Sequence, residues 1–145
     1  MQSLGEEAEK DVVKSVTCPN CQDRLELLPR NNPLFDVQCK RCIFRAQVKA
    51  GKNPKVGTLY GASWEIMNKT TKSGYSIPQL IIVFKWQEND RQKQEIRFYP
   101  FIQKDNLKPW KKSKSRITQT FNYVRLKALP YFYYTKGEWK TRTSD

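Results

Sequence analysis

Two CxxC pairs are the feature of this sequence that most constrains its fold. Residues 22–38 separate Cys18 and Cys21 from Cys39 and Cys42, a spacing that places four thiolates around one tetrahedral Zn²⁺. The alternatives are four free thiols or two disulfides, and a reducing compartment favours the metal over disulfides. Because four cysteine ligands leave no open coordination position, we predict a structural zinc site and not a catalytic one.

Composition narrows the class of protein. The chain has 145 residues, of which 38 % are hydrophobic, so we expect one domain over 1–145 with its own core. It has no histidine, which excludes Ser-His-Asp catalysis and histidine-containing metal sites. The 27 Lys and Arg against 14 Asp and Glu give a net charge of +13, which favours a nucleic-acid partner. A membrane surface is the weaker alternative, because no basic amphipathic helix is visible.

The N-terminal residues are polar and acidic, unlike a signal peptide. The longest apolar run, Leu80–Phe84, is far shorter than the roughly 20 residues that cross a bilayer. We therefore expect an intracellular protein, cytoplasmic or nucleoid-associated.

Hydrophobic periodicity predicts an α/β chain. We expect helices at 4–16 and 58–72, the second with Thr58 as its N-cap. Residues 79–86 read as a central strand buried on both faces, and 87–94 as a hairpin turn. Further strands are expected at 95–102, 121–126 and 131–134.

The second CxxC pair is predicted at the tip of a β-hairpin. Residues 34–38 read as extended, and residues 43–49 alternate between polar and apolar side chains after Ile43. In such a hairpin, Asp36 lies opposite Gln47, and Lys49 lies on the same face as Gln47. A carboxylate, an amide oxygen and an ammonium group then converge on one point.

That convergence suits metal-dependent phosphodiester hydrolysis. Asp36 is a candidate Mg²⁺ ligand, Gln47 a second oxygen ligand, and Lys49 a group that orients water or neutralises developing charge. The alternative is structural: Asp36 as a turn acceptor, with Gln47 and Lys49 as exposed polar residues of an amphipathic strand.

Several segments, in order, resemble the DpnI and dam-replacing family of PD-(D/E)XK endonucleases. They are CPNC at 18–21, FDVQCKRC at 35–42, RAQVKAG at 45–51, LYGASWEIM at 59–67 and FNYVRLKALP at 121–130. The resemblance implies a restriction-endonuclease-like mixed central sheet flanked by helices, with a four-cysteine zinc hairpin inserted and projecting from the sheet. It also implies cleavage of double-stranded DNA at Asp36, Gln47 and Lys49, with Mg²⁺ as the catalytic metal and Mn²⁺ as a substitute.

Two departures from the family pattern bear on activity. Gln47 stands where the family has Glu, which removes one negative charge from the expected Mg²⁺ site. Glu6, Glu7 or Glu9 of the first helix is the expected source of a compensating acidic ligand. Residues 131–145 leave no room for the C-terminal module with which the family reads methylated DNA, so methylation-sensitive restriction is an open expectation.

A basic segment follows these motifs. We expect a loop at 108–116 to contact DNA phosphates on either side of the cut through Lys108, Lys111, Lys112, Lys114 and Arg116. The alternative for this segment is a solvated loop before a strand. On DNA we expect a monomer or a transient dimer.

Two other functions stay open. The protein could be an inactive DNA-binding protein of the same fold, or a zinc-ribbon module that binds RNA or acts in transcription.

Overall fold

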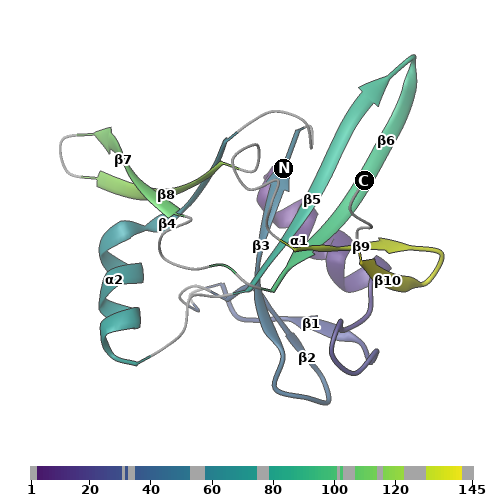
Figure 1. Ribbon diagram of the computed structural model, residues 1–145, viewed down its shortest axis with the longest axis horizontal. Coiled ribbons are helices and arrows are strands. Elements are labelled where there is room, and N and C mark those ends of the chain that lie inside the picture. The colour runs from purple at the N-terminus through teal and green to yellow at the C-terminus, as the bar shows by residue number, and fades with distance from the viewer. Residues whose placement is uncertain are drawn as a thin grey trace.

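The computed structural model describes residues 3–30, 32, 35–52, 58–74, 79–100, 102, 107–113, 116–122 and 130–141. It is a mixed α/β structure, in which a seven-stranded sheet and a three-stranded sheet lie side by side (Figure 1). The larger sheet has the strand order β1-β2-β3-β5-β6-β9-β10, and the smaller one has the order β4-β8-β7. The two helices are α1 (Leu4–Ser15) and α2 (Trp64–Lys72). The strands are β1 (Leu25–Leu27), β2 (Val37–Cys39), β3 (Arg45–Gly51), β4 (Thr58–Ser63), β5 (Gln79–Glu88), β6 (Arg91–Tyr99), β7 (Leu107–Ser113), β8 (Arg116–Asn122), β9 (Phe132–Thr135) and β10 (Glu138–Thr141).

β5 is the central strand of the larger sheet, as the sequence predicts. Its residues Leu80–Phe84 are all buried, because both faces of the strand are covered. β5 runs parallel to β3 and antiparallel to β6. The parallel pair requires a crossover between β3 and β5, and β4 and α2 lie within that connection.

Helix α1 covers one face of this sheet. Ser3 caps it, since the Ser3 side chain accepts a hydrogen bond from the backbone N–H of Glu6 at 3.1 Å. Ala8 and Val12 are buried in a core that includes Val48 of β3 and Ile81 of β5. The predicted helix at 4–16 is therefore confirmed to within one residue.

The opposite face of the sheet buries a cation among aromatic rings. The guanidinium of Arg97 lies 5.2 Å from the ring centre of Phe84 and 4.3 Å from that of Tyr131. It donates to the carboxylate of Glu95 and, at 3.3 Å, to the hydroxyl of Tyr99. These contacts compensate a charge that would otherwise be costly to bury.

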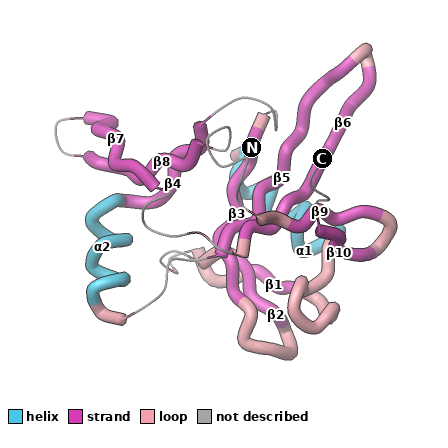
Figure 2. Tube along the Cα trace, viewed as in Figure 1, coloured by secondary structure: helices cyan, strands magenta, loops and turns pink. Residues whose placement is uncertain are grey.

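The predicted helix at 58–72 is wrong in its first half. Residues 58–63 form β4, which pairs with β8, and the helix begins only at Trp64. Thr58 is therefore a strand residue and not an N-cap. The apolar spacing of this segment fits a helix, but pairing with a strand distant in sequence overrides that preference. Helix α2 packs beside β4 and β8 of the smaller sheet (Figure 2), and its first residue, Trp64, also packs against the core on one face of the larger sheet.

The predicted turn at 87–94 is also too long. β5 continues to Glu88 and β6 starts at Arg91, so that only Asn89 and Asp90 make the turn. Both have positive φ angles, 51° and 61°, which is the geometry of a two-residue hairpin turn. The following strand ends at Tyr99, directly before a proline that cannot donate to the ladder.

The strands near the C-terminus differ from prediction in extent. A strand ends at Asn122 where 121–126 was expected, and residues 123–126 lie outside the described part of the chain. The strand expected at 131–134 is β9, and it pairs with β10, which the sequence analysis missed.

The cysteine-bearing hairpin belongs to the sheet and does not project from it. β1, β2 and β3 are consecutive antiparallel strands of the seven-stranded sheet. The expectation of an inserted, projecting hairpin is therefore wrong. The physical reason is burial: Leu25 of β1 and Val37 of β2 are 1 % and 0 % exposed in the main core.

Gly51, the last residue of β3, permits close contact with β5. A Cβ atom at this position would lie 2.5 Å from Cδ1 of Phe84, whose ring is fully buried and cannot move away. We expect Gly51→Ala to lower the free energy of unfolding by about 1–3 kcal/mol, measured by urea denaturation. Gly5→Ala is the matched control, because the nearest atom to its Cβ is 3.9 Å away and alanine favours helix. Equal stability of the two variants would contradict this account.

None of the helices in the described part of the chain is long and apolar enough to cross a membrane.

Candidate functional site

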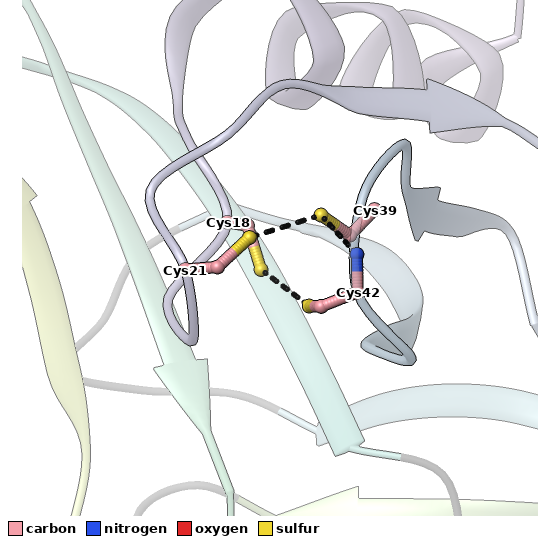
Figure 3. A group of neighbouring side chains, drawn as sticks. All are labelled: Cys18, Cys21, Cys39 and Cys42. Atoms are coloured by element: carbon pink, nitrogen blue, oxygen red, sulfur yellow. Dashed lines mark hydrogen bonds between the residues drawn. The ribbon is translucent and has the colours of Figure 1, made fainter.

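The four cysteines converge at one end of the β1–β3 hairpins. Cys18 and Cys21 lie in the turn between α1 and β1, Cys39 ends β2, and Cys42 lies in the turn before β3 (Figure 3). Their sulfur atoms all lie within 4.8 Å of one another, and none forms a disulfide. Sulfurs bound tetrahedrally at about 2.3 Å from zinc are roughly 3.8 Å apart. The four thiols can therefore hold a metal ion such as zinc.

Neighbouring groups set the protonation of these thiols. The amide Nδ2 of Asn20 donates to Sγ of Cys42 at 3.4 Å, and this bond, as the largest cause, lowers the pKa of Cys42 to about 6. Burial raises the pKa of Cys18 to about 12, so that without a metal this thiol keeps its proton. Asn20 is a site residue that the sequence analysis did not single out. Asn20 lies between the two cysteines of the first CxxC, where polar groups commonly donate hydrogen bonds to the sulfurs. This position was the feature of the sequence that could have identified it.

A second polar cluster lies where β2 begins beside β3. The backbone N–H of Asp36 donates to the carbonyl of Ala46 at 2.9 Å, and Oδ2 of Asp36 accepts from the N–H of Val48 at 2.8 Å. Asp36 therefore binds the backbone on both sides of Gln47, which is the position that the hairpin register predicts. This pair is in the interior of the sheet and not on an edge strand, because β3 lies between β2 and β5.

Glu9 and Lys49 complete this cluster. Glu9 of α1 lies close enough to Asp36 and Lys49 to interact electrostatically with both. Partial burial first, and then the charge of Asp36, raise the pKa of Glu9 to about 7, so that Glu9 is mostly protonated below neutral pH. The Lys49 ammonium interacts electrostatically with both carboxylates, but burial is the larger effect and lowers its pKa below 10.5. Two carboxylates, an ammonium and the neighbouring Gln47 thus meet in one partly buried place.

The other two glutamates of α1 are directed elsewhere. Glu6 pairs with Arg30 at 3.3 Å, and Glu7 pairs with Lys85 at 3.0 Å. Lys85 also contacts Asp11 at 2.6 Å, which fastens α1 to β5. Of the three glutamates expected as extra acidic groups, Glu9 is the one that interacts electrostatically with Asp36 and Lys49.

The basic segment is a β-hairpin and not the loop that the sequence suggests. Lys108, Lys111 and Lys112 lie on β7, and Arg116 lies at the start of β8. The register pairs Lys108 with Thr120 and Lys111 with Ile117. The β-branched residues Ile117, Thr118 and Thr120 favour the extended conformation of β8, with which β7 pairs. Lys114 lies outside the described residues.

Neither the protein-family models nor the curated proteins contain a significant match to this chain.

Proposed function

We propose that this protein is a Mg²⁺-dependent endonuclease that cleaves double-stranded DNA, with a PD-(D/E)XK-type site at Asp36, Gln47 and Lys49. The observation that carries the proposal is that Asp36, held by the N–H of Val48 at 2.8 Å, lies within electrostatic reach of both the Glu9 carboxyl group and the half-buried Lys49. Surface carboxylates repel one another, and two carboxyl groups close together beside a half-buried lysine are an arrangement typical of catalytic sites.

The donor set fits a hard divalent cation. Asp36 and Glu9 offer carboxylate oxygens and Gln47 an amide oxygen, which are ligands that Mg²⁺ accepts. When bound, Mg²⁺ would polarise the scissile phosphate and acidify a water molecule.

Each of these site residues would then have a distinct role. Asp36 is fixed by its bond to the N–H of Val48 and so presents one oxygen in a constant position. Glu9 restores the negative charge that is missing at Gln47. Lys49, with a pKa lowered by burial, orients the attacking water and neutralises charge that develops on the phosphate.

The protein charge and the cysteine cluster agree with this role. A net charge of +13 attracts a polyanion, and the basic residues of β7 and β8 are candidates for contacts to the DNA backbone. We expect zinc in the four-cysteine site to fix the β2–β3 turn and, through it, the position of Asp36 relative to Lys49.

A second candidate is a DNA-binding protein of this fold that does not cut. Gln47 favours it, because the glutamine supplies one charge fewer for the metal than glutamate does. The two candidates differ in one result, which is strand cleavage.

The test is incubation of purified protein with supercoiled plasmid, methylated or unmethylated, in Mg²⁺, Mn²⁺ or excess EDTA. We expect nicked and linear products only with a divalent cation, because two carboxylates cannot polarise a phosphate without one. A gel shift without cleavage under every metal would instead support the binding protein. A difference in cleavage between methylated and unmethylated plasmid would support restriction-type specificity, and equal cleavage of the two would argue against it.

A further inference from the structure

An apolar side chain stands on the polar face of the strand that carries Gln47 and Lys49. Along residues 43–49 exposure alternates, with Phe44, Ala46 and Val48 buried and the residues between them turned outward. Ile43 is the first outward residue and is 94 % exposed. Isolated apolar residues on a surface are common, but this one is distinguished by how it is held and by what surrounds it.

The turn that presents Ile43 is rigid. Sγ of Cys39 accepts hydrogen bonds from the backbone N–H groups of Arg41 and Cys42, each at 3.3 Å. The N–H of Cys39 donates to the carbonyl of Phe44 at 2.9 Å, which closes the turn behind Ile43. Ile43 therefore cannot fold back onto the core, and it meets a partner without losing backbone freedom.

Cations surround this apolar tip. Lys40, Arg41 and Arg45 are exposed, and Arg24 is exposed on the adjoining segment, where its carbonyl accepts from the N–H of Lys40 at 3.0 Å. Asp23 is an acidic neighbour, 4.0 Å from Arg41. An interface with another protein needs contiguous apolar area, whereas a single apolar side chain among several cations suits a duplex with charged backbones and apolar groove walls.

The tip is in line with the candidate catalytic residues. At about 3.3 Å per strand residue, Ile43 lies roughly 20 Å from Lys49, which corresponds to about six base pairs of duplex. Arg45 lies between them, with its guanidinium 6.0 Å from the ring centre of Phe35, the residue before Asp36. A duplex placed at Lys49 and running along β3 would therefore meet Arg45 first and then Ile43.

We propose that the turn over residues 40–45, the knuckle surface, binds duplex DNA beside the cleavage position, with Ile43 inserted into the minor groove. Lys40, Arg41 and Arg45 contact the phosphates on the two sides of that groove. Apolar side chains that enter the minor groove in this way are an established mode of DNA binding. This inference rests on the proposed function for the identity of its ligand, but it concerns binding and not cleavage.

The test measures binding of a fluorescein-labelled duplex by anisotropy over a series of salt concentrations, in a Lys49→Ala background, in which we expect cleavage to be too slow to consume the duplex during the measurement. We expect Ile43→Ser to weaken binding about tenfold with an unchanged salt slope, because the lost contact is apolar. Ile43→Leu should restore binding. The triple variant Lys40→Gln, Arg41→Gln, Arg45→Gln should reduce the slope by about 0.9 per lost phosphate contact.

Leu4→Ser is the matched control, since Leu4 is another exposed apolar residue, at 68 %, on α1. Binding by Ile43→Ser equal to that of the background, or an equal loss in Leu4→Ser, would overturn the knuckle surface while the proposed nuclease stands. Failure of the unsubstituted protein to bind any duplex at low salt would overturn the proposed function and this inference together. A melting curve of each variant checks that it is folded, as we expect for substitutions at exposed positions.

Discussion

Replacing Cys39 by serine is expected to abolish zinc binding and to remove most of the stability of the β1–β3 region. Cys39 supplies one of the four clustered sulfurs that can hold a metal ion, and its sulfur also accepts two backbone hydrogen bonds in the turn. Structural zinc sites contribute about 10–16 kcal/mol of apparent binding free energy, which exceeds the whole stability of many domains. We expect Cys39→Ser to contain less than stoichiometric zinc and to melt about 15 °C or more below the unsubstituted protein.

Metal content after purification and thermal unfolding by circular dichroism measure the two effects. Lys40→Ser is the control, because Lys40 is an exposed residue of the same turn and offers no sulfur. It should retain its zinc and its melting temperature. Stoichiometric zinc in Cys39→Ser with unchanged melting would show that the cluster does not depend on all four sulfurs.

Lys49→Ala is expected to reduce the rate of DNA cleavage by about 10²–10³-fold while duplex binding is retained. Removing one group that stabilises charge in a transition state typically has an effect of this size. The affinity for DNA depends on many cations, so the loss of one partly buried lysine changes it little. Single-turnover cleavage of plasmid in Mg²⁺ gives the rate, and anisotropy gives the affinity.

Lys52→Ala is the control for charge, since Lys52 is exposed just beyond β3 and carries the same charge. Its cleavage rate should stay within about twofold of the unsubstituted rate, as for most surface substitutions. Gln47→Glu separates the two candidate functions: it should tighten Mg²⁺ binding in a nuclease, and it would create cleavage from none in an inactive protein. A Lys49→Ala variant that cuts as fast as Lys52→Ala would rule out the proposed site.

The sequence predicts the local parts of this fold well. The spacing of the cysteines, the periodicity of α1 and the run of apolar residues in β5 each depend on neighbours within a few residues. The position of Asp36 beside Gln47 also follows from a short hairpin register. These features share one property, which is that each is determined within one continuous segment, the longest being residues 18–42 with the four cysteines.

The missed features depend on contacts between distant segments. β4 has helical apolar spacing, and only pairing with β8 makes it a strand. β10 joins the sheet through β9, and the indole N–H of Trp139 donates to the carbonyl of Thr17 at 2.6 Å. Which glutamate of α1 meets Asp36 depends on how the helix is rotated against the sheet. No pattern within one segment specifies that rotation.

The smaller sheet has a consequence for the order of folding. β4 lies in the connection from β3 to β5, and β7 and β8 lie in the connection from β6 to β9. The residues paired between β4 and β8, such as Thr58 and Asn122, are 122 − 58 = 64 positions apart. Closing so long a loop is slow and entropically unfavourable unless the ends are already held. We therefore expect the pairing of β4 with β8 to form late, after the larger sheet has brought the two connections together.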